Sequence, residues 1–376
     1  MNDVVIVGAG QAGFQTAASL RLEGFDGSIT LIGEEPHLPY QRPPLSKGVL
    51  SGKQSFDSLP FRPEKFYQDH SIDLLLSQRA VSIDREARRV QLASRTSVEY
   101  DHLVLATGAR VRKLPVSGVH YLRDRDDALE LKARLESAAN VAIVGGGFIG
   151  LEVASAARAM GKPVTLVEAL DRLMARCVAP VVSSFFHDVH AAEGVAVILN
   201  STEIPRADLI VAGIGVIANV DLAHAAGLTV RHGIVVDAFL RTIDPNIFAI
   251  GDCAEAANGL RLESVQNAAD QARSVATQIV HGPSAYRAVP WFWTDQFDIK
   301  LQMAGISSPR HRAVLRGTTE SRRFSVFYFD GAGRLAAVDS VNRPGDHMVA
   351  RKMLAARTAL TPEQAGDESV DLKALL

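Results

Sequence analysis

The chain has 376 residues, of which 47% are hydrophobic and 22% charged, a composition typical of globular proteins. Its formal net charge of −2 excludes the broad positive field by which proteins attract nucleic acid. Residue 4 already enters a strand pattern, and no run of about 18 apolar residues occurs. We therefore expect two or three domains in a cytoplasmic protein, without a membrane span or a secretion signal.

The first predicted elements are an apolar strand at residues 4–7, a G-x-G-x-x-G loop and a helix. In such a loop the glycines allow a tight turn, a close approach to a pyrophosphate, and packing of helix on strand. The phosphate binds the free amides of the helix N-terminus. A second strand at residues 28–32 leads to Glu34, at the spacing expected for a carboxylate that binds a ribose. The loop residues are Gly8, Gly10, Ala12 and Gly13.

A proline-rich segment at residues 36–47 follows this unit. Because prolines lack the backbone donor, it is predicted to form a structured loop. A buried strand at residues 103–106 then returns to the sheet, so that the first domain includes residues 1–112. The residues at its end are Ala106, Thr107, Gly108 and Arg110.

Residues 113–236 repeat this plan as an inserted second domain. A helix at residues 126–137 precedes a strand at 141–144, a second glycine loop, and a strand at 164–167 that ends in Glu168. A further strand is predicted at residues 209–212. The predicted phosphate-binding residues are Gly145, Gly147, Ile149 and Gly150, and the last strand ends in Gly213 and Gly215. Two such loops predict a protein that holds two dinucleotides and moves electrons between them.

The acid at position 168 favours NADH over NADPH. A carboxylate accepts a hydrogen bond from a ribose 2′-hydroxyl and repels a 2′-phosphate. Arg172, four residues further on, is the one nearby cation expected to offset this preference.

The chain then returns to the first domain over residues 237–290. A strand at residues 246–250 ends in Gly251 and Asp252, and a helix is predicted at 264–280. Residues 291–376 alternate in polarity and end in a helix at 347–356, so they predict a separate α+β domain.

The chain has only two cysteines, Cys177 and Cys253, without C-x-x-C or C-x₄-C spacing. A disulfide reductase built on two dinucleotide folds needs a proximal dithiol, and an iron–sulfur cluster needs about four ligands. We therefore expect organic redox cofactors, no bound metal, and cysteines that serve as small packed residues.

Together these motifs resemble the FAD-dependent ferredoxin reductases of bacterial cytochrome P450 and aromatic-dioxygenase systems. The resemblance extends over almost the whole chain. It implies a glutathione-reductase-like α/β fold with a two-part FAD domain, an inserted NAD domain and a C-terminal interface domain. The segments that carry it are residues 8–13, 39–47, 106–110, 145–150, 251–252, 261–268 and 290–296.

The resemblance also implies roles for single residues on the FAD side. Arg42 lies near the phosphates, Arg110 and Asp252 complete the cradle, and Lys47 lies near the flavin ring. Val265 and Gln266 begin a helix whose N-terminus faces the flavin N1–C2=O edge, where positive charge stabilises the reduced ring. The alternative for that segment is an ordinary amphipathic helix.

On the NAD side, the resemblance implies that Glu152 faces the nicotinamide and pairs with Lys47. The alternatives are a first-turn acid favoured by the helix dipole and a solvated loop cation. Trp293 is expected at the flavin edge or in the core. The resemblance further implies that hydride passes from NADH to flavin N5, and that single electrons then pass to a [2Fe–2S] ferredoxin that supplies a P450. An acidic ferredoxin calls for a basic patch on the monomeric reductase, expected among Arg310, Arg312, Arg316, Arg322, Arg323, Arg343, Arg351 and Lys352.

Three other functions stay open. An NADH oxidase or peroxidase on this scaffold needs a cysteine in the loop that here contains residues 43–46, and none is present. A redox sensor resembling apoptosis-inducing factor needs basic tracts that are missing, and a rubredoxin is a possible acceptor. Residues 199–208 also lack a hairpin that the resemblance implies, through either a contraction or omitted loops.

Overall fold

The computed structural model describes residues 3–376, which form two compact units. The first contains the chain up to Gln41, together with Asp57–Arg110 and Val216–Ala288. The second contains Arg42–Phe56, Val111–Gly215 and Val289–Leu376. The chain therefore passes between the units five times.

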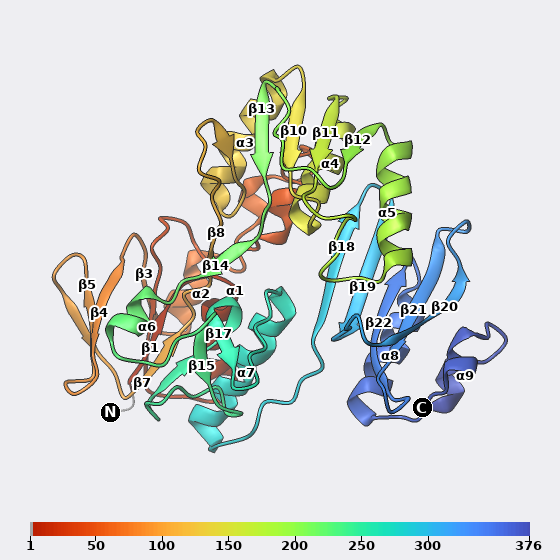
Figure 1. Cartoon of the computed structure of the whole chain (residues 1–376). Helices are drawn as coiled ribbons and strands as arrows, with labels where there is room; N and C mark the ends of the chain where they lie inside the picture. The colour runs from red at the N-terminus through yellow and green to blue at the C-terminus, as the bar shows by residue number, and fades with distance from the viewer. Residues whose placement is uncertain (1–2) are drawn as a thin grey trace. The chain divides into compact units, whose positions relative to one another are not determined.

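A parallel sheet in the order β16-β7-β1-β2-β3 forms the centre of the first unit (Figure 1). Its strands are short apolar runs, as expected for a parallel sheet covered on both faces. The residues of β1 from Val4 to Val7 are at most 6% exposed. The strands are β1 (Asp3–Val7), β2 (Ser28–Ile32), β3 (Ile72–Leu75), β7 (His102–Leu105) and β16 (Ile247–Ala249).

Two helices, α1 (Gln11–Leu22) and α7 (Val265–His281), pack together in this unit. Helix α7 confirms the helix predicted at residues 264–280, and it begins after Ser264, whose hydroxyl accepts the amide of Asn267 at 3.1 Å. The smaller elements are α2 (Glu64–Asp69), α6 (Asp221–Ala225), η3 (Gly251–Cys253), β15 (Ile234–Val236), β17 (Ala254–Ala256) and the antiparallel strands β4 (Ala80–Asp84), β5 (Arg89–Leu92) and β6 (Ser97–Glu99). Three short elements lie at the passages between the units, namely η2 (Phe56–Ser58), β8 (Ala109–Val111) and β14 (Val216–Ala218).

The second unit contains a parallel sheet of the same kind, in the order β12-β11-β10-β13-β9. Helix α3 (Arg125–Ser137) starts one residue before the predicted bound, because Asp124 and Asp127 form a reciprocal capping box there. The other elements are β9 (Val119–His120), β10 (Val141–Val144), α4 (Phe148–Ala159), β11 (Val164–Val167), α5 (Pro180–Ala192), β12 (Val195–Ile198) and β13 (Leu209–Ala212), together with η1 (Pro43–Ser46).

An antiparallel sheet, β18-β19-β22-β21-β20, completes the second unit. Helix α8 (Pro344–Ala356) begins three residues before the predicted start at 347, because Pro344 fits the first helical turn, where no amide partner is needed. The remaining elements are β18 (Trp291–Gln296), β19 (Ile299–Gly305), β20 (Arg312–Thr318), β21 (Arg323–Phe329), β22 (Leu335–Val341), α9 (Pro362–Gly366) and η4 (Leu372–Leu375).

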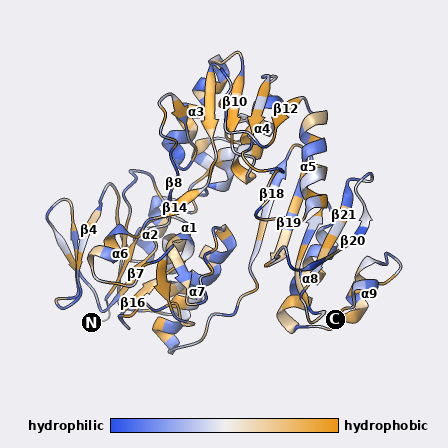
Figure 2. Cartoon of the chain, viewed as in Figure 1, coloured by the Kyte–Doolittle hydropathy of each residue, from blue (hydrophilic) through white to orange (hydrophobic). Residues whose placement is uncertain are grey.

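Hydrophobic colour concentrates on the strands of the parallel sheets, as β10 and β13 show in Figure 2. Among residues 3–376, no helix combines the length and apolar character needed to cross a bilayer. Residues 199–208, between β12 and β13, form neither helix nor strand. Two backbone hydrogen bonds hold the start of this segment, from the Asn200 amide to the Leu170 carbonyl at 3.0 Å and from the Ser201 amide to the Glu168 carbonyl at 3.1 Å.

Candidate active site

The turn between β1 and α1 depends on close contacts that exclude side chains. Gly8 has a φ of +111°, and a Cβ built there would lie 2.2 Å from the carbonyl oxygen of Ala106. A Cβ at Gly13 would lie 1.8 Å from the carbonyl oxygen of Gly8. At Gly10, in contrast, a Cβ would meet no atom within 4 Å. Two glycines therefore close the turn, and the third leaves open space in front of the helix.

Segments that are distant in sequence meet at this turn. A Cβ on Gly251, whose φ is +72°, would lie 3.3 Å from the Cβ of Ala12 and 3.6 Å from that of Ala268 in α7. Helix α1 has no side-chain cap and no acid in its first turn, so its amides face an open, anion-attracting space. The residues present thus fit the pyrophosphate of a dinucleotide such as FAD.

The start of α7 also fits the predicted contact with a flavin. The Ser264 hydroxyl accepts a hydrogen bond from the Asn267 amide. Within residues 3–376, the amides of Val265 and Gln266 have no hydrogen-bond acceptor. These two donors therefore remain for an electron-rich edge of a bound ring.

The other residues predicted for this cradle differ in their contacts. Glu34 is 72% exposed, with Arg79 Nε 3.8 Å away, so its carboxylate is accessible to a ribose. Arg110 Nη1 donates to Asn219 Oδ1 and Asp221 Oδ2, both at 3.1 Å. Thr107 donates its hydroxyl to the Asn219 carbonyl at 2.7 Å. Asn219 thus anchors the end of the cradle, a role for which the sequence carried no signal.

Two further residues of the predicted cradle contribute through their backbone. The Gly251 amide donates to Gln271 Oε1 at 2.7 Å, and the carbonyl of Asp252 accepts from Arg261 Nη1 at 3.0 Å. Within the first unit these bonds tie η3 to α7 and to the segment that leads into it.

The second glycine loop repeats the geometry of the first. Gly145 has a φ of +105°, and a Cβ there would lie 2.6 Å from the carbonyl oxygen of Gly213. A Cβ at Gly150 would lie 2.0 Å from the carbonyl oxygen of Gly145. Gly147 has more room, because its Cβ would meet only the Gly213 oxygen, at 3.8 Å. The N-terminus of α4 again lacks a side-chain cap, and Ile149 is 43% exposed in its first turn. This cradle also fits a dinucleotide.

Glu168 holds the second loop directly. Its Oε2 accepts from the Gly146 amide at 2.6 Å, and its Oε1 accepts from the Leu170 amide at 2.8 Å. Arg172 donates to the carbonyls of Ala175 and Val178 at 2.6 and 2.9 Å. The cation that was expected to offset Glu168 is therefore engaged in holding its own loop. Gly215, with a φ of +96°, accepts from the Arg112 amide at 2.9 Å.

Lys47 and Glu152 form the most enclosed ion pair among the predicted residues. Lys47 Nζ lies 2.8 Å from Glu152 Oε1, and the two side chains are 21% and 3% exposed. The carboxylate also accepts from Ser46 Oγ at 2.5 Å and from Thr294 Oγ1 at 2.6 Å. The alternative of a first-turn acid is wrong, because α4 begins at Phe148 and has no acid in its first turn. The alternative of a solvated loop cation is also wrong, because Lys47 pairs with the buried carboxylate of Glu152.

Sequence reasoning missed the polar groups behind this pair. Thr294 and Gln296 on β18 are completely buried, as is His190 on α5. Burial lowers the pKa of His190 to about 4. Alternation along β18 places Thr294 and Gln296 on one face, but nothing in the sequence indicated that this face meets α4 and α5.

Arg42 and Trp293 also belong to the second unit. Arg42 Nη1 donates to the Arg123 carbonyl at 2.7 Å. Trp293 is half-buried, and its ring centroid lies 5.5 Å from that of Trp291, over which the Arg351 guanidinium lies at 4.7 Å.

The predicted basic patch is smaller than expected. Arg316 is only 5% exposed and binds backbone carbonyls of the C-terminal segment, so it is not a docking residue. Arg322 and Arg343 pair with Asp298 and Glu368. For Arg310, Arg323 and Lys352 no ion pair is recorded within the described part of the chain.

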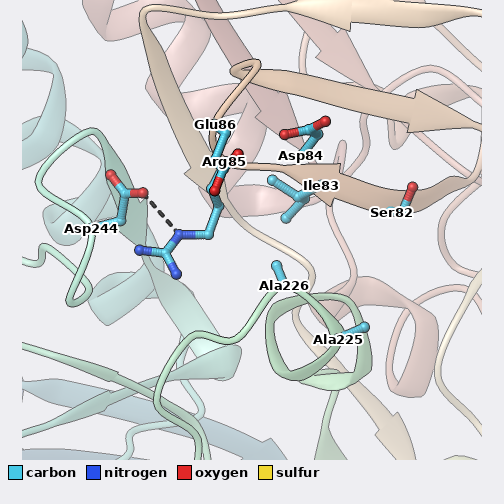
Figure 3. Close-up of a pocket in the computed structure, with 8 residues that line it drawn as sticks. All are labelled: Ser82, Ile83, Asp84, Arg85, Glu86, Ala225, Ala226 and Asp244. Carbon is cyan, nitrogen blue, oxygen red and sulfur yellow. Dashed lines mark hydrogen bonds and ion pairs between the residues drawn. The ribbon is translucent and has the colours of Figure 1, made fainter.

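A surface hollow of about 660 Å³ lies elsewhere in the first unit (Figure 3). Arg85 Nε donates to Asp244 Oδ2 across it at 2.9 Å. No predicted site residue is among those that line it.

Comparison with known proteins covers nearly the whole chain. A family model described as pyridine nucleotide-disulphide oxidoreductase matches residues 2–272, and one described as reductase C-terminal matches residues 291–376. Rhodocoxin reductase of Rhodococcus erythropolis is 49% identical, over 98% of this chain and 93% of that protein.

Solved structures agree over the full length. The ferredoxin reductase for the CYP199A2 system from Rhodopseudomonas palustris superposes with a TM-score of 0.96 at 47% identity, covering 100% of this chain and 99% of that one. A chain of the covalent putidaredoxin reductase–putidaredoxin complex gives 0.95 at 38% identity, covering 100% and 98%.

Proposed function

We propose a specific electron-transfer role from the premise that this chain belongs to the pyridine nucleotide-disulphide oxidoreductase family, as one of its FAD-dependent ferredoxin reductases. As a monomer, it takes electrons from NADH and passes them to an acidic [2Fe–2S] ferredoxin that supplies a cytochrome P450 or related oxygenase. The observation that carries the proposal is the pair of open glycine cradles together with the enclosed Lys47–Glu152 pair.

Residues 1–112 and 237–290 are assigned to FAD, 113–236 to NADH and 291–376 to the partner interface. When bound, FAD supplies the chemistry that accepts two electrons together and releases them singly. The amides of the first loop bind its pyrophosphate, Glu34 its ribose, and the start of α7 its electron-rich edge. The second loop and Glu168 bind NADH in the corresponding way.

Lys47 and Glu152 act by position and charge. Lys47 presents an ammonium on the flavin side, and Glu152 presents a carboxylate on the nicotinamide side. Each restrains the other, because separating a buried ion pair leaves an uncompensated charge. The reaction then needs mainly orientation and exclusion of water, for which a fixed pair is suited.

Anaerobic stopped-flow mixing tests this function. We expect NADH to bleach the flavin rapidly and the reduced protein then to reduce a [2Fe–2S] ferredoxin rapidly. Glu152→Gln keeps the size of the side chain but removes the charge, and is expected to slow bleaching about thirtyfold. Bleaching without transfer to several ferredoxins would indicate an oxidase or a rubredoxin reductase, and bleaching over minutes would indicate a redox sensor.

Coenzyme preference gives a second prediction. Glu168→Gln removes the charge that repels a 2′-phosphate, so the ratio of kcat/KM for NADH to that for NADPH should fall about tenfold. Arg172→Lys is the control, because Arg172 binds the carbonyls of Ala175 and Val178 and is expected to leave the ratio unchanged. A ratio that responds to position 172 but not to 168 would contradict the assignment.

Partner binding is proposed to use three cations of the predicted basic patch that have no ion pair among residues 3–376, namely Arg310, Arg323 and Lys352. Attraction between exposed charges weakens with salt, so electron transfer to an acidic ferredoxin should slow as salt rises while flavin reduction by NADH does not.

A further inference from the structure

The carboxylate of Glu152 lies at the end of a hydrogen-bonded series that extends away from Lys47 through the second unit. Thr294 Oγ1 lies 2.6 Å from Glu152 Oε1, and Gln296 Nε2 lies 3.3 Å from Thr294 Oγ1. Gln296 Oε1 in turn lies 2.9 Å from His190 Nε2. Thr294, Gln296 and His190 are all 0% exposed. Figure 1 shows their elements β18 and α5 next to each other.

The direction of every hydrogen bond in this series follows from its first member. A carboxylate only accepts, so the single hydroxyl proton of Thr294 is given to Glu152. Thr294 can then only accept from Gln296, which must present its NH₂ group. The amide oxygen of Gln296 therefore faces His190, whose Nε2 must carry the proton.

The second ring nitrogen is consistent with this order. Burial lowers the pKa of His190 to about 4, so the imidazole is neutral near pH 7 and has one N–H. Its Nδ1 has no hydrogen-bond partner within residues 3–376, as expected for the bare nitrogen of this tautomer. All three donors thus point toward Glu152.

We infer that Thr294 is a positioning residue for the Lys47–Glu152 pair, itself held in place by Gln296 and His190. Oε1 of Glu152 lies within contact distance of both Thr294 Oγ1 and Lys47 Nζ, and Oε2 accepts from Ser46. The two hydroxyls fix the rotation of the carboxylate, so that the ammonium meets a fixed oxygen. Thr294 and Gln296, which lie two residues apart on the buried face of β18, therefore serve to orient the carboxylate of Glu152.

The expected effect on the rate of flavin reduction rests on the proposed function, whereas the hydrogen bond from Thr294 to Glu152 does not. Thr294→Val keeps the shape and removes the donor, whereas Thr294→Ser keeps the donor and removes a methyl group. Loss of one hydrogen bond to a charged group should slow anaerobic flavin reduction by NADH about tenfold in Thr294→Val. The loss should appear at saturating NADH with little change in KM, and Thr294→Ser should restore most of the rate.

A double-mutant comparison separates positioning from a general structural defect. If Thr294 acts through Glu152, then Thr294→Val should have little further effect in the Glu152→Gln protein. Equal additional loss in both backgrounds would overturn the inference, as would equal rates in Thr294→Val and the wild type. If the wild type itself were not reduced rapidly by NADH, the proposed function would fail instead.

A second measurement does not depend on turnover. The carboxylate of Glu152 gives an infrared band whose position depends on the hydrogen bonds that the carboxylate accepts. The band is obtained by subtracting the spectrum of FAD-loaded Glu152→Gln from that of the FAD-loaded wild type, both without NADH. We expect the band to shift in Thr294→Val and to return in Thr294→Ser. A band that is identical in all three proteins would refute the hydrogen bond, whatever the kinetics.

Discussion

Replacing Gly150 by alanine is expected to slow reduction of the flavin by NADH at least about a hundredfold while FAD stays bound. The added Cβ would lie 2.0 Å from the carbonyl oxygen of Gly145, so the second loop must move by about 1 Å. A displacement of that size is enough to cost about a hundredfold in rate. The first loop belongs to the other unit and has its own contacts. Stopped-flow bleaching and the absorbance of bound flavin are the measurements.

Gly147→Ala is the matched control, because its Cβ would be 3.8 Å from the nearest atom. The loop then keeps its shape, and the methyl group only occupies space in front of the helix. We expect a weaker affinity for NADH, by about tenfold, with a nearly unchanged rate at saturation. If the flavin of the Gly150→Ala variant were reduced by NADH at the wild-type rate, this loop would not be the NADH-binding loop.

Replacing Asp339 by asparagine is expected to remove a large pH dependence of stability. Burial raises the pKa of Asp339 to about 7, although the hydrogen bond from Tyr328 opposes this. The folded protein therefore holds a proton that the unfolded chain has released. The stabilisation is complete below the unfolded pKa near 4 and is lost as the pH rises to about 7, on the order of a few kcal/mol.

Denaturant unfolding at about pH 5 and about pH 8 measures this effect. The wild type should lose stability between the two values, and Asp339→Asn should lose less. The free-energy cost of burying the amide introduced by Asp339→Asn is the same at both pH values, so it cancels when the two stabilities are subtracted. Tyr328→Phe removes the hydrogen bond that opposes the rise in the pKa of Asp339. The loss of stability with rising pH should therefore continue to a higher pH in this variant than in the wild type. Equal slopes in all three proteins would contradict the assignment of this proton to Asp339.

Much of the fold follows from local patterns in the sequence. Strand, glycine loop and helix adjoin each other at Gly8 and again at Gly145, so each cradle was predictable from about thirty residues. Helix α3 begins earlier than predicted because of a capping box, and helix α8 because of Pro344. Such features move the end of a helix without changing the apolar pattern from which the helix is predicted.

The candidate site was less predictable where it depends on distant contacts. The pairing of Lys47 with Glu152 came from a resemblance, not from spacing. Thr294 and His190 carried no signal, because a polar residue in a strand or helix is usually exposed. Only the packing of β18 against α4 and α5 gives these residues their partners. The same holds for Arg316, whose charge suggested a surface that its burial excludes.

The division of the chain also bears on how such reductases can be recombined. The short segment Arg42–Phe56 belongs to the second unit, although the first unit flanks it on both sides in sequence. It contributes both Ser46 and Lys47 to Glu152. A chimaera that exchanged only residues 111–215 would place a foreign acid opposite the parental lysine and serine. Exchange of coenzyme modules between homologues should therefore include residues 42–56, and β18 with them, as one co-inherited set.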